Sequence, residues 1–186
     1  MTAPLKVKYN KEVAKMLKKE LGKKNLLSLP RLLKVNINVG IGSDVTGGNK
    51  DYSSVEQSVA AITGQKPSVR KARLAVSNFK LRIGMPVGLS ITLRGDRMYN
   101  FIERLVNVAL PRVRDFRGIS VKGFDKKGNY CLGLKDVTIF PEVEMEKLPK
   151  THGLQINVCT SAENDREAYL LLKALGFPFN NEVKEQ

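Results

Sequence analysis

Leu33–Ile41 has the sequence LKVNINVGI, in which aliphatic residues alternate with two asparagines and a glycine. Val87–Leu93, VGLSITL, alternates in the same way, with Gly88, Ser90 and Thr92 at the intervening positions. Successive side chains of a strand point to opposite faces, so both segments predict strands with one apolar face and one face of short polar groups. These two strands decide the fold, because they require a sheet that is covered on one side only.

Helical periodicity separates the strands. The expected helices are Asn10–Gly22, Ser53–Gly64, Asp96–Leu110 and Asn164–Gly176. Asn10 is expected to cap the first helix, and Ser53 with Glu56 to form a capping box at the second. Further strands are expected over Pro67–Lys71, Tyr130–Val137 and Leu154–Thr160. Because the connections are irregular, we expect an α+β fold: a largely antiparallel sheet with helices packed on one face and an open, polar second face.

Length and composition limit the class of protein. The chain has 186 residues, of which 42% are hydrophobic and none is tryptophan, which suits one good core, so residues 1–186 are expected to form a single domain. No apolar run approaches the ~20 residues of a membrane span, and no secretory signal is recognisable, so a soluble cytoplasmic protein is expected. Cys131 and Cys159 have neither close spacing nor neighbouring histidines, and are expected to be small core residues.

Positive charge dominates the chain, with 32 lysines and arginines against 18 acidic residues and a formal net charge of +14. The stretch from Gln57 to Gly95 contains no Asp or Glu at all. A cationic segment without acidic neighbours repels itself unless a polyanion neutralises it, which indicates a nucleic-acid partner. Residues 73–85 within it show no clean period and predict a basic loop that is mobile in the free protein.

The charge is also uneven along the chain. Residues 1–135 hold 27 basic and 9 acidic side chains, whereas residues 136–186 hold 5 basic and 9 acidic ones. A cationic part and a mildly acidic part on one body indicate two kinds of neighbour, with a polyanion on one side and something else on the other.

Catalytic and metal-binding patterns are missing. His152 is the only histidine, and neither a cysteine nor a serine motif accompanies it. Gly40–Lys50, GIGSDVTGGNK, lacks the Gly-Lys-Ser/Thr of a phosphate loop and the third glycine of a dinucleotide fingerprint. Glu142, Glu144 and Glu146 do not have the spacing of a calcium loop. We therefore expect no catalytic residues, no cofactor and no metal.

Two interpretations of a basic, non-enzymatic chain remain open at this point. It is a component of a stable ribonucleoprotein, or it is a free-standing RNA-binding regulator or RNA chaperone. Both use the open sheet face, since short amides and hydroxyls there can reach the 2′-hydroxyls and phosphates of the shallow RNA minor groove.

Eight short motifs carry a family resemblance. They are Ile62–Pro67 (ITGQKP), Lys71–Arg73 (KAR), Phe79–Lys80 (FK), Thr92–Gly95 (TLRG), Asp96–Met98 (DRM), Arg112–Gly118 (RVRDFRG), Gly128–Tyr130 (GNY) and Ile139–Glu142 (IFPE). In order and spacing the chain resembles the bacterial-type large-subunit ribosomal protein five family, the 5S rRNA-binding ribosomal proteins, from about residue 9 to Phe179.

The resemblance implies a structural component of the central protuberance that helps attach 5S rRNA to the large subunit. Its partners would be 5S rRNA, large-subunit rRNA, transfer RNA in the peptidyl site, a small-subunit head protein and neighbouring 5S rRNA-binding ribosomal proteins. Asn38, Gln65 and Thr92 match the family's 5S rRNA contacts. With the strand face and its basic fringe, the expected rRNA-binding residues are Asn36, Asn38, Gln65, Lys66, Ser90, Thr92 and Arg94.

The basic loop matches the family's contact with transfer RNA. The expected tRNA-binding residues are Arg73, Ser77, Asn78, Phe79, Lys80 and Arg82. Leu74 and Asn78 depart from the family's usual pattern there, where a basic residue and a glycine are common. For an intersubunit bridge, the resemblance and the charge split together point to Arg112, Arg114, Asp115, Arg117, Glu142 and Glu144.

Overall fold

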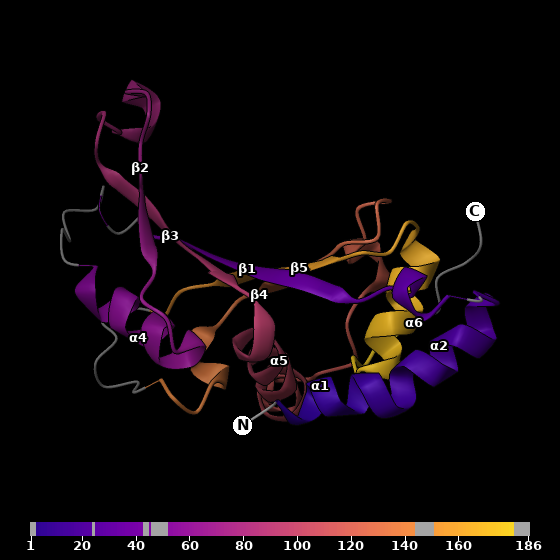
Figure 1. The fold of residues 1–186 in the computed structure, drawn as a ribbon. Coiled ribbons are helices and arrows are strands. Elements are labelled where there is room, and N and C mark those ends of the chain that lie inside the picture. Colours follow the sequence, from indigo (N-terminus) through magenta and orange to yellow (C-terminus); the bar gives the residue numbers. More distant parts are fainter. Residues whose placement is uncertain (1–2, 24, 43–44, 46–51, 144–150, 181–186) are drawn as a thin grey trace. The chain divides into compact units, whose positions relative to one another are not determined.

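The computed structural model describes residues 3–23, 25–42, 45, 52–143 and 151–180. Its helices are α1 (Pro4–Lys8), α2 (Ala14–Leu21), α4 (Ser53–Thr63), α5 (Gly95–Arg104) and α6 (Asp165–Ala174). Its strands are β1 (Leu32–Gly40), β2 (Ser68–Lys71), β3 (Pro86–Leu93), β4 (Tyr130–Leu134) and β5 (Leu154–Thr160), shown in Figure 1.

The five strands form one sheet in the order β2-β3-β1-β5-β4. β2 pairs antiparallel with β3, with Ser68 opposite Ser90 and a register shift at the end of β2. The Ser90–Asn38 and Thr92–Asn36 hydrogen bonds run in opposite senses along β3 and β1, as an antiparallel pair requires. The predicted α+β fold with a largely antiparallel sheet is confirmed.

The chain divides into two compact units, each crossed by part of the sheet. The first unit comprises Met1–Val35, Leu93–Leu132 and Asn157–Gln186, and the second comprises Asn36–Thr92 and Gly133–Ile156, in each case as far as the residues are described. The expectation of a single domain stays a prediction.

In the first unit, a continuous helical stretch runs from α1 through a π-helical turn, Tyr9–Val13, into α2. Asn10 therefore lies inside the helix, and its expected role as a cap is wrong, because the helix already starts at Pro4, six residues earlier. Leu17 of α2 is completely buried. Gly22, with φ +64°, ends the helix in the left-handed conformation that favours glycine.

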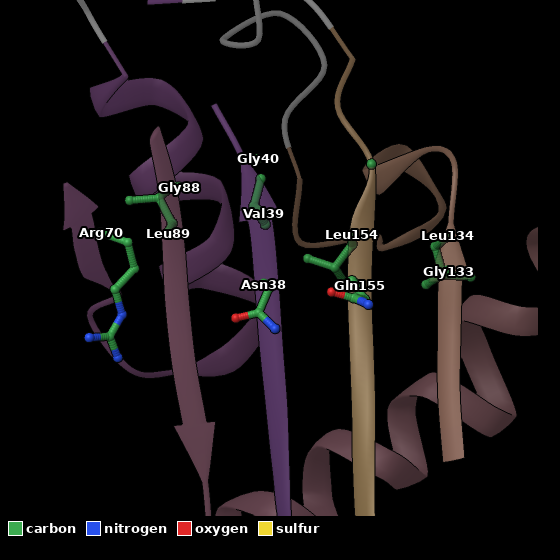
Figure 2. A pocket seen from close by; sticks show the side chains of 11 residues that line it. Asn38, Val39, Gly40, Arg70, Gly88, Leu89, Gly133, Leu134, Leu154 and Gln155 are labelled. Atoms are coloured by element: carbon green, nitrogen blue, oxygen red, sulfur yellow. The ribbon is translucent and has the colours of Figure 1, made fainter. Parts of the chain in front are cut away.

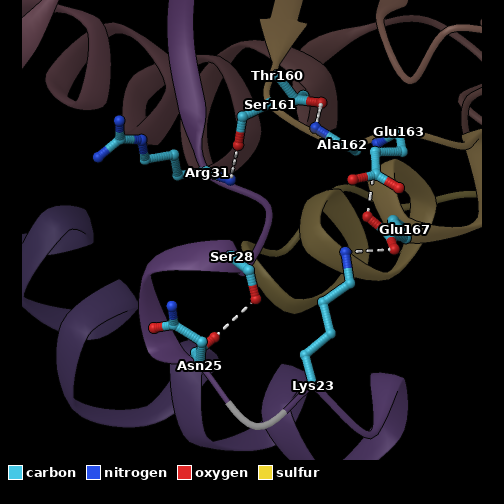
Figure 3. Close-up of polar contacts among 9 residues, drawn as sticks. All are labelled: Lys23, Asn25, Ser28, Arg31, Thr160, Ser161, Ala162, Glu163 and Glu167. Atoms are coloured by element: carbon cyan, nitrogen blue, oxygen red, sulfur yellow. Dashed lines mark hydrogen bonds and ion pairs between the residues drawn. The ribbon is translucent and has the colours of Figure 1, made fainter.

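Polar contacts also fasten the start of β1 within this unit, as Figure 3 shows. The Arg31 backbone N–H donates to Ser161 Oγ at 3.0 Å, and Lys23 Nζ lies 2.6 Å from Glu167 Oε1 on α6. Glu167 is only 9% exposed, so this ion pair satisfies a carboxylate that the packing of α6 has removed from water.

Helices α1, α2, α5 and α6 lie on one side of the sheet strands of the first unit (Figure 1). α5 was expected to run to Leu110, and its helical course does continue through a π-helical segment, Leu105–Ala109, into a 3₁₀ turn, Leu110–Arg112. Its buried side chains include Met98, Phe101 and Ile102. The apolar periodicity thus identified the helix, although it did not distinguish α from π winding.

In the second unit, β1 keeps the alternation on which the sequence argument rested. Ile37 and Val39 are 1% and 2% exposed, whereas Asn36 and Asn38 are half-buried on the other face. α4 lies along one side of β2 and β3 and buries Val55, Val59 and Ile62. The helix begins after Tyr52, the residue at its N-cap, so the expected capping box with Ser53 at that position is wrong.

β4 is shorter than expected. It ends at Leu134, and the chain then turns through a 3₁₀ segment, Val137–Ile139. Within the described residues, no helix combines the length and the apolar character needed to cross a bilayer.

Candidate nucleic-acid interface

Two pairs of short polar side chains are held in place on the open face of the second unit. Ser90 Oγ donates to Asn38 Oδ1 at 2.9 Å, and Thr92 Oγ1 donates to Asn36 Oδ1 at 3.0 Å. Each bond joins neighbouring strands and uses the carbonyl oxygen of the amide, which orients the Nδ2 group. Among the described residues, Asn38 Nδ2 donates to no other group, so its hydrogens are available to an external acceptor.

Gln65 and Lys66 follow α4 in the same unit. Thr63 Oγ1 donates to the Gln65 carbonyl at 3.0 Å, while Gly64 takes φ +67° and ends the helix as predicted. Lys66 Nζ lies 3.7 Å from Glu56 Oε1. At least one cation of the acid-free stretch therefore has an acidic partner, because the fold brings the Glu56 carboxylate of α4 close to Lys66.

Arg94 is exposed and stands at the N-cap of α5. It belongs to the first unit, whereas the other six expected rRNA-binding residues belong to the second. Those six lie on β1 and β3 and in the turn after α4.

The expected basic loop, 73–85, is built as a hairpin that continues β2 and β3 (Figure 1). Val76 and Leu81 exchange two backbone hydrogen bonds of 3.0 and 3.1 Å, and Ala72 N–H donates to Met85 O at 2.8 Å. Lys80 has φ +53°, which closes the 3₁₀ turn Ser77–Phe79 at the tip. The mobility of this loop in the free protein stays a prediction.

The hairpin tip carries exposed apolar side chains as well as cations. Leu74, Phe79 and Ile83 are 74%, 70% and 72% exposed. Within the described part of the chain, no ion pair joins Arg73, Lys80 or Arg82 to a carboxylate, and no acidic residue occurs in the hairpin. Exposed aliphatic and aromatic groups among unpaired cations are typical of a surface that contacts both the bases and the phosphates of RNA.

The expected bridge residues are divided between the units. Arg112, Arg114, Asp115 and Arg117 are exposed in the first unit, and Asp115 takes φ +50°. Glu142 is half-buried in the second unit. Glu144 lies outside the described residues.

A shallow hollow of about 460 Å³ lies on the open face of the second unit, and the sequence argument missed it (Figure 2). Its polar lining consists of Asn38, Arg70 and Gln155, from β1, β2 and β5. Gln155 alternates with buried residues along β5, and this alternation is visible in the sequence. The charge pattern did not point to Gln155, because β5 lies outside the acid-free stretch.

The cysteines differ from expectation. Cys131 is exposed and Cys159 is half-buried, because both alternate with the core-facing residues of their strands. Their expected place in the core is wrong. In the part of the chain that the structure describes, no three His, Cys, Asp or Glu side chains are grouped so as to hold a metal ion.

Comparison with known proteins decides the family. The model described as "Ribosomal protein L5" matches residues 25–82, and the model of the "ribosomal L5P family C-terminus" matches residues 86–179. The chain belongs to the ribosomal protein L5 family. The resemblance drawn from the eight motifs is thereby confirmed.

Bacterial L5 proteins match this family member over almost their full length. The large ribosomal subunit protein uL5 of Chloroflexus aggregans is 50% identical over 181 residues, 97% of this chain and 100% of the relative. That of Anaeromyxobacter sp. (strain K) is 52% identical over 179 residues, 96% of this chain and 99% of the relative. That of Symbiobacterium thermophilum is 49% identical over 177 residues, 95% and 98% of the two chains.

Proposed function

We propose that this L5 family member is a structural, non-enzymatic component of the large ribosomal subunit that binds 5S rRNA through the open face of its second unit. Full-length bacterial relatives of about half-identical sequence are named large ribosomal subunit proteins, which supports the ribosomal role. A net charge of +14 supports an RNA partner.

The observation that carries the 5S rRNA contact is the pair of ordered amides on β1. Asn38 Oδ1 accepts from the Ser90 hydroxyl, which orients the amide, so its N–H groups can bond to an external acceptor with little further loss of side-chain entropy. Ribose hydroxyls and phosphate oxygens are the acceptors that double-helical RNA exposes in its minor groove. The contact would be completed in the second unit by Asn36, Gln65, Lys66, Ser90 and Thr92, and Arg94 of the first unit would bind rRNA as well.

The same proposal assigns the hairpin to transfer RNA in the peptidyl site. The guanidinium and ammonium groups of Arg73, Lys80 and Arg82 would neutralise phosphates, while Phe79 would pack against a base or ribose. Ser77 and Asn78, at the turn of the tip, would supply hydrogen bonds. The exposure of the tip side chains and the missing carboxylates support an RNA contact, while the choice of transfer RNA follows from the family resemblance.

The proposal places the large-subunit rRNA and other 5S rRNA-binding proteins beside the protein. It assigns Arg112, Arg114, Asp115 and Arg117 of the first unit, and separately Glu142 of the second together with Glu144, to an intersubunit bridge with a small-subunit head protein. A bridge of exposed ion pairs would be weak, at ~0.2–1 kcal/mol per pair, and would tolerate movement between the subunits.

A titration with isolated 5S rRNA tests the central statement. Replacing Asn38 or Thr92 by Ala should weaken binding by ~1–2 kcal/mol each, since each removes a hydrogen-bonding group from the interface. Asn100, exposed on α5, provides the matched control, and Asn100→Ala should bind as the wild type does. Equal affinity for all four proteins at equal thermal stability would remove the sheet face from the 5S rRNA contact. A wild-type protein that stays in the soluble fraction, away from large subunits, would instead favour the free-standing regulator.

A further inference from the structure

The hollow on the open face extends beyond the two central strands. Its lining reaches from Arg70 on the edge strand β2, across Asn38 on β1, to Gln155 on β5 and Gly133 on β4, all in the second unit. Figure 2 shows the Asn38 and Gln155 side chains on adjacent strands, with Arg70 beside β3. None of the side chains that line it is acidic.

The polar groups suit a ribose-phosphate backbone. Arg70 is exposed, and within the described residues no ion pair joins it to a carboxylate. A guanidinium can accept a phosphate in a bidentate fashion, whereas amide groups on neighbouring strands can bond to 2′-hydroxyls. The spacing of sheet strands, about 4.8 Å, places successive amides within reach of successive riboses.

Four glycines line the hollow, and at two of them no contact with the described residues would exclude a side chain. A Cβ at Gly88 or Gly153 would lie 3.2 or 3.1 Å from a neighbouring carbonyl oxygen, so the packing of the sheet accounts for these two. A Cβ at Gly133 or Gly40 would meet nothing within 4 Å, and neither residue needs a positive φ. Gly40 is the last residue of β1, whereas Gly133 lies inside β4. A strand interior disfavours glycine, so Gly133 points to an object outside the fold that approaches the backbone closely.

We propose that the hollow seats a segment of RNA backbone, with Arg70 on a phosphate, the amides of Asn38 and Gln155 on ribose hydroxyls, and the strand at Gly133 in direct contact with the chain. This deepens the proposed function and rests on it. It extends the RNA-binding face from β1 and β3 to β5 and β4, where no RNA-binding residue was expected. The RNA chemistry is the same whether the segment belongs to 5S rRNA or to large-subunit rRNA.

Gly133→Val is the sharpest test, because valine favours strands and its side chain would project into open space in the free protein. Thermal stability should be unchanged, whereas affinity for the RNA that fills the hollow should fall about tenfold or more. Gln155→Ala should weaken the same binding by about five- to tenfold. Cys131→Val is the matched control: it lies two residues earlier on the same face of β4, is exposed, and does not line the hollow.

Each protein is titrated with isolated 5S rRNA and, separately, with large-subunit rRNA lacking 5S rRNA. A loss for Gly133→Val and Gln155→Ala in one titration supports the proposal and identifies the source of the segment. If the wild type binds and both variants keep its affinity in both titrations, the proposal that the hollow seats RNA is overturned. The proposed 5S rRNA contact of β1 and β3 is then unaffected. An equal loss in Cys131→Val also overturns the proposal for the hollow. A wild type that binds neither RNA overturns the proposed function itself.

Discussion

Tyr130 belongs to an aromatic cluster in the first unit and is 2% exposed. Its ring centroid lies 4.8 Å from that of Phe124 and 5.5 Å from that of Phe179, which also contacts Tyr169 and Phe177. The Tyr130 hydroxyl donates to the Ser120 carbonyl at 2.8 Å. The cluster thus joins Phe179 to the start of β4, and the hydroxyl of Tyr130 has a hydrogen-bond partner.

Burial raises the pKa of Tyr130 from 10.0 to about 12. Because of this raised pKa, the Tyr130 hydroxyl of the folded protein stays protonated at pH values where that of the unfolded chain is ionised. The stability contributed by the neutral phenol is therefore complete below pH 10 and is lost as the pH rises from 10 towards 12. Tyr130→Phe should cost about 1 kcal/mol at neutral pH, through the lost hydrogen bond, but this deficit should shrink above pH 10.

Urea unfolding of both proteins between pH 7 and pH 11.5 measures the difference. Burial also raises the pKa of Tyr9 and Tyr99, and their effect cancels because both proteins retain them. A deficit that stays constant to pH 11.5 would contradict the assignment.

At the scale of a single element, the turn before β4 is held by two carboxylates. Asp165 accepts from the backbone N–H groups of Lys126 and Gly128, both at 3.1 Å, and Asp125 accepts from Lys127 and Asn129. The hydrogen bonds of Asn129 lower the pKa of Asp125 although partial burial opposes them. The turn therefore has a rigid shape before any partner binds.

Gly128 makes this shape possible. It has φ +76°, and a Cβ there would lie 2.6 Å from the Ala162 carbonyl oxygen. Gly128→Ala should destabilise the protein by about 2–4 kcal/mol, because backbone strain and a steric clash add. Gly22 separates the two effects, since it has φ +64° but open space around its Cβ position. Gly22→Ala should cost only about 1 kcal/mol. Equal losses in thermal unfolding would show that the clash is relieved by movement of the turn.

The hairpin of residues 73–85 allows a second prediction about an element. Replacing Arg73, Lys80 and Arg82 by Ala should lower the salt dependence of tRNA binding, with a slope in log–log form that falls by about 2–3, since three phosphate contacts are lost. Binding of 5S rRNA should change little.

Phe79→Ala should weaken tRNA binding by ~1–3 kcal/mol without changing that slope, because stacking involves no counterions. The chain contains no tryptophan, so Phe79→Trp introduces a unique fluorophore whose quenching on adding tRNA reports the contact directly. If the triple variant lost 5S rRNA binding instead, the hairpin would belong to a different RNA.

For the whole molecule, the division of charge implies two kinds of neighbour. Changing Glu142, Glu144 and Glu146 together to Lys should leave 5S rRNA binding intact but weaken subunit joining at low magnesium, because a basic head protein would then be repelled. The ratio of joined to free subunits on a sucrose gradient measures this. An unchanged ratio would exclude these glutamates from the bridge and leave Arg112–Arg117 as the candidate.

Much of this architecture could be predicted because its causes are local. Alternation with period two identified β1 and β3, and apolar spacing of three to four identified α5 and α6. Helix starts were less predictable: Asn10 has the side chain of a cap but lies inside a helix, and Ser53 is the first residue of α4 while Tyr52 stands at the N-cap. Tertiary packing can override the local preference for a cap residue, and the residues next to the cap do not carry that information.

The sequence by itself determined the fold class, the family and the basic character of the chain, since periodicity, motif spacing and charge are properties of neighbours along the chain. Only the tertiary structure decided which strands lie side by side. That placement joins Ser90 to Asn38, brings Glu56 to Lys66 and sets Arg70, Gln155 and Gly133 around one hollow. Arg70 of β2 and Gln155 of β5 are 85 positions apart in the sequence, and only the pairing order of the sheet puts them on one face.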